Sequence, residues 1–173
     1  RSIFFKDLEH YMGMIREFLI SRYDAIANNY CSSNPIAFVE GGLLGGTKKP
    51  SDKIGHDIVK TFTASFGITA LNELNVLMEG KPLHESDQAN VKEVVAFINS
   101  KIEQFKNEDG YLYALYGTPA ESLCGTQVRQ FKAKYGVIEG VSDREYFSNS
   151  FHMHVTADIT PMQKQDLEHD LFH

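Results

Sequence analysis

The chain has 173 residues, of which 42% are hydrophobic and 23% are charged, a balance typical of a globular protein with one core. Its formal net charge of −6 argues against a free-standing nucleic-acid binder, since such proteins are usually basic. No apolar run approaches the roughly 20 residues that span a bilayer, and no signal-peptide pattern follows Arg1. We therefore expect a reduced, cytoplasmic protein that contacts neither membrane nor nucleic acid directly, in which Cys31 and Cys124 need not pair.

The first third of the chain predicts a long helix and then a short strand. Apolar residues recur at helical spacing over residues 3–29, and residues 35–39 form an apolar run typical of a buried strand. Four glycines follow it, Gly41, Gly42, Gly45 and Gly46. They lack the order of a dinucleotide-binding loop and no Lys-Ser/Thr pair follows them, so we interpret them as a turn.

The middle of the chain alternates between helix and strand signals. Ser51 can cap a short helix that runs to about residue 60, and β-branched and aromatic residues predict a strand over 61–68. Helices are expected over 70–78 and from Ser86 to Gly110. Residues 111–116 are almost wholly apolar and predict a strand buried on both faces. This alternation favours an α/β fold with partly parallel strands.

Three segments have the sequence pattern of a helix start. The clearest is Thr118-Pro119-Ala120-Glu121, where threonine would cap the helix and the glutamate would fold back onto the threonine N–H. The same pattern recurs at residues 160–163 and more weakly at residues 142–145. Because the last helix would run only to His173, and the first residue is not methionine, we expect a piece of a longer protein.

Two segments together resemble the second half of the class III, anaerobic ribonucleotide reductases. The first is Tyr-Gly-Thr-Pro-Ala-Glu-Ser-Leu at residues 116–123. The second is Gly-Val-Ile-Glu-Gly-Val-Ser-Asp-Arg-Glu-Tyr-Phe-Ser-Asn-Ser-Phe-His at residues 136–152. Upstream, residues 65–68 and 71–73 are similar to a strand and the following helix of that family. The resemblance covers about residues 30–173, and the run from Asp143 to His152 is its most specific part.

The resemblance implies part of a ten-stranded α/β barrel that reduces ribonucleoside triphosphates to deoxyribonucleotides by radical chemistry. It implies a glycyl radical, a thiyl cysteine on a finger loop, formate as reductant, a zinc site outside this chain, and a radical-SAM activating enzyme as partner. No glycyl-radical motif and no Cys-x-x-Cys pair occurs here, and neither cysteine lies in a matching motif. We therefore expect residues 1–173 to form a single-domain fragment, with a helix over 3–29 and then a half-barrel, that supplies barrel wall and substrate contacts but is inactive alone.

The expected substrate contacts lie where the resemblance is densest. They are Gly117, Thr118, Pro119, Ala120, Glu121, Ser122, Asn149, Ser150 and His152. A strand that runs into a helix N-terminus presents free N–H groups to phosphate, although the same residues could form a helix cap and nothing more. The polar residues 149–152 could equally satisfy buried backbone groups. His152 and His154 would share one strand face, where a structural role is favoured over a metal site.

Two features leave alternatives open. Cys124 lies just inside an expected helix, which could lower its pKa, but a buried inert thiol is favoured. The chain could also be a non-catalytic structural or binding remnant of the reductase, or part of a glycyl-radical enzyme of the pyruvate formate-lyase type. In each case an open half-barrel would expose strand edges and apolar surface, so we expect self-association and contact with the remainder of the reductase subunit.

Overall fold

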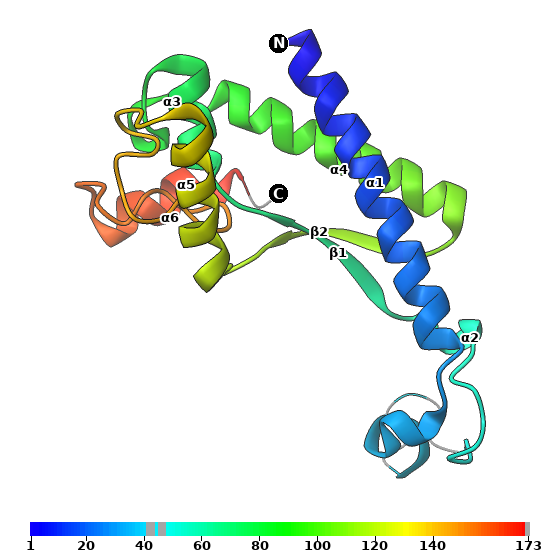
Figure 1. The fold of residues 1–173 in the computed structure, drawn as a ribbon. Helices are drawn as coiled ribbons and strands as arrows, with labels where there is room; N and C mark the ends of the chain where they lie inside the picture. Colours follow the sequence, from blue (N-terminus) through cyan, green and yellow to red (C-terminus); the bar gives the residue numbers. More distant parts are fainter. Residues whose placement is uncertain (41–43, 45–47, 172–173) are drawn as a thin grey trace. The chain divides into compact units, whose positions relative to one another are not determined.

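The computed structural model describes residues 1–40, 44 and 48–171 (Figure 1). It is a mixed α/β structure in which helices predominate and two strands form one sheet. The elements in chain order are α1 (Ser2–Ala27), η1 (Cys31–Ser33), η2 (Ile36–Glu40), α2 (His56–Val59), β1 (Thr63–Ile68), α3 (Leu71–Glu79), η3 (Leu83–Glu85), α4 (Ala89–Asp109), β2 (Leu112–Gly117), α5 (Glu121–Tyr135) and α6 (Pro161–His169).

The chain divides into two compact units. Unit 1 comprises Arg1–Ser65 and Lys101–Ala114, and unit 2 comprises Phe66–Ser100 and Leu115–His173. Both strands and α4 contribute residues to each unit. The expectation of a single domain over residues 1–173 stays a prediction.

Unit 1 is built on α1, which confirms the predicted N-terminal helix. Its inner face buries Met12, Leu19 and Tyr23. Arg16 is joined to Asp109 at the end of α4 by two hydrogen bonds, one of them from Nε at 2.8 Å, and its guanidinium lies 4.6 Å from the centre of the Phe105 ring. Paired, two-pronged contacts of this kind fix orientation as well as distance. They attach the long helix α1 to the second half of α4.

Two predictions for the stretch after α1 were wrong. Residues 35–39 are not a strand, and residues 36–39 lie in the π-helical turn η2, because Asn34 accepts the N–H groups of Ala37 and Phe38 with its side-chain and backbone oxygens. The short helix expected up to about residue 60 is present as α2 but begins at His56. Ser51 does not begin a helix. The backbone around it pairs instead with residues 30–32, as in the 2.9 Å bond from the Cys31 N–H to the Asp52 carbonyl. The predicted glycine turn lies at residues 41–46, outside the described residues apart from Leu44.

The sheet confirms both predicted strands but corrects the burial of the second. β1 and β2 lie side by side and run in the same direction (Figure 1), and β1 alternates between exposed and buried residues. β2 was expected to be buried on both faces. Tyr113 is buried, whereas Leu112 and Tyr116 are 47% and 50% exposed. Successive side chains of a strand point to opposite faces, and here one face remains accessible.

Unit 2 contains the helices that surround the candidate site. α3 ends at Gly80, whose φ of +74° gives the left-handed C-cap expected of glycine. α4 starts at Ala89, three residues after the predicted Ser86. A core of Cys124, Val128, Val141 and Phe147 joins α5 to the irregular segment that follows it.

The two weaker helix-start signals had opposite outcomes. α6 begins as predicted, with a complete capping box between Thr160 and Gln163. Ser142 begins no helix, because its hydroxyl donates to the Gly136 carbonyl and accepts the Ile138 N–H within a tight turn. Residues 136–160 therefore form an irregular segment that carries the most specific part of the sequence pattern.

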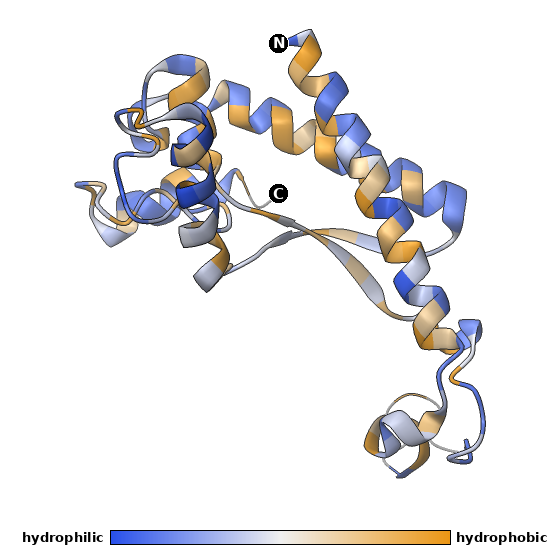
Figure 2. Cartoon of the chain, viewed as in Figure 1, coloured by the Kyte–Doolittle hydropathy of each residue, from blue (hydrophilic) through white to orange (hydrophobic). Residues whose placement is uncertain are grey.

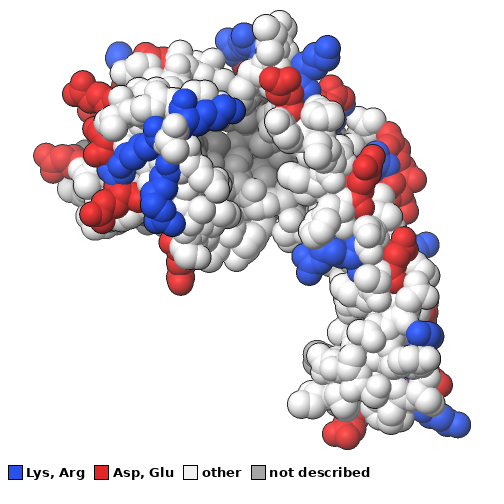
Figure 3. Space-filling model, in the orientation of Figure 1, with Lys and Arg blue, Asp and Glu red and all other residues white. Residues whose placement is uncertain are grey.

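The surface is of mixed polarity. Hydrophobic and hydrophilic residues alternate around the helices (Figure 2), and Lys and Arg side chains lie among Asp and Glu on the face drawn in Figure 3. Among residues 1–40, 44 and 48–171, no helix combines the length and the apolar character needed to cross a bilayer.

Candidate functional site

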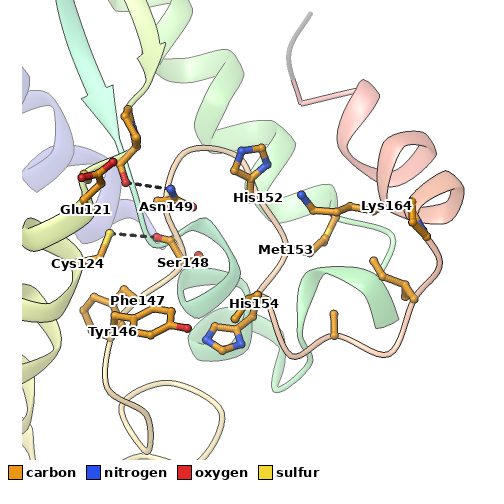
Figure 4. Close-up of a pocket in the computed structure, with 16 residues that line it drawn as sticks. Glu121, Cys124, Tyr146, Phe147, Ser148, Asn149, His152, Met153, His154 and Lys164 are labelled. Atoms are coloured by element: carbon orange, nitrogen blue, oxygen red, sulfur yellow. Dashed lines mark hydrogen bonds between the residues drawn. The ribbon is translucent and has the colours of Figure 1, made fainter.

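A cavity of about 580 Å³ lies in unit 2 between the start of α5, the 146–159 segment and α6 (Figure 4). Five of the nine predicted site residues line it, namely Pro119, Ala120, Glu121, Asn149 and His152. Figure 4 shows Glu121 on the α5 side, and His152 and Lys164 on the side of the loop and α6. The structure thus brings together two sequence segments that are about thirty residues apart.

The predicted capping of α5 by Thr118 was wrong. α5 begins at Glu121, its N-cap is Ala120, and no side chain caps it. The reason is that neighbouring backbone and side-chain groups hold the preceding residues. The Thr118 carbonyl accepts the Ser150 N–H at 3.1 Å, and the Asn149 side chain donates to the Pro119 carbonyl at 2.9 Å. Glu121 therefore does not fold back and stays exposed at the pocket wall.

Gly117, Thr118, Ser122 and Ser150 do not line this cavity. The backbone of Gly117 packs closely against Ser150 and Phe151, because a Cβ added at Gly117 would lie 2.1 Å from the Ser150 hydroxyl and 2.9 Å from the Phe151 ring. Thr118 sits against Gly67, where an added Cβ would meet its methyl group at 3.2 Å. Ser122 lines a neighbouring cavity. These residues shape or flank the pocket instead of facing it.

A buried carboxylate on α3 holds the first end of the pocket segment. Glu73 is 2% exposed and accepts the Ser148 N–H with both oxygens at 3.1 Å and the Ser148 hydroxyl at 2.6 Å. Arg144 lies 3.7 Å away. A buried carboxylate needs such donors to offset its loss of water, so this network fixes the segment immediately before Asn149.

A second buried carboxylate, on α6, holds the other end. Glu168 is 6% exposed and accepts the Met153 N–H at 2.8 Å and His152 Nδ1 at 3.0 Å. Residues 148–153 are thus fixed between two helices by two acidic side chains. Neither glutamate was among the predicted site residues. Glu73 was noted only as part of the resemblance, and a lone acidic residue in a helix carries no sequence signal of burial.

Backbone strain gathers around the same segment. Of the four non-glycine residues with positive φ in the described part of the chain, three are Ala70, Ala120 and Ser150, at 62°, 45° and 52°. The Ala70 N–H donates to the Ser148 carbonyl at 2.8 Å. Ala120 follows Pro119, whose carbonyl accepts the Asn149 side chain, and Ser150 belongs to the segment itself. Strained residues persist where surrounding contacts over-determine them, which is common at functional sites.

The two predicted histidines do not share a strand face, because residues 152–154 are irregular. His154 stacks on Tyr146 with ring centres 6.0 Å apart. Desolvation, together with the charge of Arg144, holds its pKa below the ordinary value. The Thr156 N–H donates to Nδ1, so the proton of the neutral ring is on Nε2, a buried atom with no hydrogen-bond partner among the described residues.

Cys124 lines the pocket as a buried thiol whose pKa is raised by burial, with a smaller contribution from Glu73. Its sulfur donates weakly to the Ser148 carbonyl at 3.8 Å (Figure 4). A raised pKa disfavours the reactive thiolate and supports the interpretation of an inert thiol. Within the described ranges, no group of three or more His, Cys, Asp or Glu residues is placed to hold a metal ion.

Comparisons with known proteins agree on one family. A family model described as anaerobic ribonucleoside-triphosphate reductase matches residues 1–173. The chain is 32% and 31% identical over 172 residues to proteins of that name from Salmonella typhimurium and Escherichia coli. It is 30% identical over 158 residues to the one from Enterobacteria phage T4. These matches cover 96%, 96% and 88% of this chain but 24% of each relative, so the chain spans about a quarter of their length.

Proposed function

The chain belongs to the anaerobic ribonucleoside-triphosphate reductase family, and we propose that it forms part of the substrate-binding wall of such an enzyme. The parent reaction is the conversion of ribonucleoside triphosphates to deoxyribonucleoside triphosphates by radical chemistry. The observation that carries the proposal is the pocket, which gathers Pro119, Ala120, Glu121, Asn149 and His152 in one cavity of unit 2. The match to the reductase family favours this function over that of a pyruvate formate-lyase type enzyme.

The pocket supports nucleotide binding through its two kinds of surface. Apolar side chains such as Phe147 and Met153 line much of it, and apolar walls suit the base and sugar of a nucleotide. The start of α5 lacks a side-chain cap, so its first N–H groups and positive dipole end are available to phosphate. The exposed charge of Glu121 opposes an anion there, but water screens it.

Within the parent enzyme we propose that the two strands belong to the wall of a ten-stranded α/β barrel. A glycyl radical there would supply the unpaired electron for hydrogen abstraction from the ribose, with formate as reductant. A zinc site and an activating radical-SAM enzyme complete the parent system. The residues of this chain bind and orient the nucleotide, and the fixed 148–153 segment keeps that geometry before substrate arrives.

The test is nucleotide binding. Titration calorimetry should show that the 173-residue chain binds a ribonucleoside triphosphate, and that Asn149→Ala weakens this binding by about tenfold, the loss expected for a polar contact of about 1.4 kcal/mol. Asn28→Ala, which alters an exposed amide in unit 1, is the matched control and should leave binding unchanged. Equal affinity of the Asn149 and Asn28 variants would contradict the proposed site.

We also propose that α1 contacts another polypeptide, either a second copy or the remainder of the reductase subunit. Tyr11, Met14, Ile15 and Phe18 are 61%, 53%, 44% and 63% exposed. Their spacing of three and four residues places them on one face of the helix. A contiguous exposed apolar face of this kind is typical of an interaction surface.

A further inference from the structure

A second cavity of unit 2, the α3 cavity, has a volume of about 800 Å³. It lies between α3, η3, the turn at residues 138–144 and the segment at residues 154–158. Among the described residues that line it, only His154 and Ala157 also line the cavity drawn in Figure 4. The proposed nucleotide site therefore does not account for the polar groups of the α3 cavity.

Two imidazole rings in the wall of the α3 cavity each hold a buried nitrogen without a hydrogen-bond partner among the described residues, Nδ1 of His84 and Nε2 of His154. His154 is 8% exposed, and its Nε2 is a donor, because Nδ1 accepts the Thr156 N–H. Nε2 of His84 lies 3.5 Å from the Glu85 carboxylate, which can only accept, so Nδ1 of the neutral His84 ring is an acceptor. Buried polar atoms are nearly always paired in native proteins, so this donor and this acceptor indicate a ligand that carries their partners.

Arg144 supplies the positive charge of the same wall. Its Nε donates to Asp143 at 3.3 Å, and its Nη1 lies 3.7 Å from the buried Glu73, beyond hydrogen-bond distance. Desolvation and then the charge of Arg144 lower the pKa of His154, so the guanidinium and that ring are close enough to interact. Because a guanidinium binds a carboxylate through two parallel N–H groups, Nη1 and Nη2 of Arg144 suit a carboxylate ligand.

Acidic and apolar side chains complete the lining. Three acidic residues of the α3 cavity are exposed, namely Glu85, Glu139 and Asp158. Their charges disfavour a polyanion such as a triphosphate and favour a cationic group on the ligand, because binding surfaces and ligands have complementary potentials. The apolar part of the wall consists of Val76, Leu77, Ile138 and Val141.

We propose that the α3 cavity binds a small zwitterion of the α-amino-acid class with an aliphatic side chain. The carboxylate of the ligand accepts from Arg144 and from Nε2 of His154. Its ammonium group donates to Nδ1 of His84 and lies toward the exposed carboxylates, and its side chain packs on the apolar wall. The inference goes beyond the proposed function and does not depend on nucleotide binding.

The experiment is titration calorimetry of the 173-residue chain with leucine and two of its derivatives. Leucine should bind. Leucinamide lacks the carboxylate and N-acetylleucine lacks the cation, and each should bind about tenfold more weakly, the loss expected when one charge-assisted contact is removed. Equal affinity for all three compounds would overturn the proposal, because it would indicate an apolar hollow that does not recognise charge.

Variants of the cavity wall locate the ligand. Arg144→Gln should weaken leucine binding by about tenfold, and His84→Leu, which removes a neutral acceptor, by about threefold or more. Arg129→Gln is the matched control, because it alters an exposed arginine that lines a different cavity, and it should leave the affinity for leucine unchanged.

A spectroscopic readout on the unaltered chain keeps the test independent of whether these variants fold. Addition of leucine should shift the imidazole nitrogen resonances of His84 and His154. The exposed ring of His10 in α1 should not respond. Leucine binding that leaves the resonances of His84 and His154 unchanged would place the ligand elsewhere and overturn the proposal.

The remaining outcomes separate this inference from the proposed nucleotide site. Asn149→Ala should leave leucine binding unchanged, and its loss in that variant would assign leucine to the first cavity. Absence of leucine binding, or leucine binding that persists unchanged in both Arg144→Gln and His84→Leu, would overturn this inference alone. A chain that binds leucine as expected but no triphosphate would overturn the proposed function and leave this inference standing.

Discussion

Replacing Glu73 by alanine should destabilise unit 2 more than any surface substitution. The side chain is buried at 2% exposure and receives the N–H and the hydroxyl of Ser148. Alanine would leave the buried Ser148 N–H without an acceptor at the point where the pocket segment begins. The substitution therefore tests whether the buried carboxylate, and not the surrounding apolar core, holds that segment in place.

The magnitude follows from the hydrogen bonds that alanine would remove. Hydrogen bonds to a charged acceptor each contribute about 1.5–3 kcal/mol, so two donors from Ser148 give about 3–6 kcal/mol. The hydroxyl can rotate toward another acceptor but the backbone N–H cannot, which favours the lower part of this range, about 3–4 kcal/mol. Arg144 adds little, since it lies 3.7 Å from Glu73 and also contacts Asp143. Glu73→Gln retains one acceptor oxygen and should lose about 1–2 kcal/mol.

Urea unfolding followed by circular dichroism measures the loss, and amide hydrogen exchange at Ser148 locates it. Glu103→Ala is the matched control, because it removes a carboxylate that is 64% exposed and paired along its own helix. Such a surface change should cost less than about 0.5 kcal/mol. A loss below about 1 kcal/mol for Glu73→Ala, with unchanged exchange at Ser148, would refute the argument.

Four further outcomes are expected. Gly117→Ala should destabilise by about 1–3 kcal/mol in thermal unfolding, and Ser150→Gly in the same chain should recover part of that, since the new Cβ would lie 2.1 Å from the Ser150 hydroxyl; full tolerance of the single variant would contradict the close contact. Thr160→Ala should cost about 1 kcal/mol by loss of its cap, whereas Thr160→Ser should not. The folded state holds the pKa of His154 below 6.5, so the unfolded chain binds a proton first and stability should fall as the pH is lowered through 6.5; a His154→Gln variant that shows the same pH dependence would exclude that residue as its source. Phe18→Glu should shift the chain toward monomer in analytical ultracentrifugation, if the exposed face of α1 mediates self-association.

Local patterns predicted the regular elements of this fold well. The spacing of apolar residues located α1 and α4, and Gly80 and Gly110 ended α3 and α4 as expected. These signals work because each depends on a few neighbouring residues and on the intrinsic backbone freedom of glycine. The sequence also singled out the two segments that line the candidate cavity, although the basis there was a family pattern and not periodicity, and their role in binding stays a prediction.

The parts that the sequence did not predict depend on contacts between distant residues. Glu73 holds a residue 75 positions later, and Glu168 one 16 positions earlier. No periodicity marks either as buried. The 148–153 segment has no regular hydrogen-bonding pattern of its own, so its conformation is set by these partners. Glu168 lies within α6. The capping pattern at Thr160 predicted this helix but not which of its faces is buried.

The two threonine-proline motifs show how tertiary contacts decide whether a similar local pattern caps a helix. At Thr160 the side chain accepts the Gln163 N–H and the helix begins at the next residue. At Thr118 the local pattern is at least as strong, yet the helix begins only after Ala120, which has a φ of +45°. The difference is that residues 149 and 150 donate to the carbonyls of residues 118 and 119, which stay outside the helix. A left-handed alanine costs roughly 1–2 kcal/mol, so these bonds must outweigh both that strain and the lost cap. The result leaves the first N–H groups of α5 without a side-chain cap beside a cavity, an arrangement that favours an anion at the helix start.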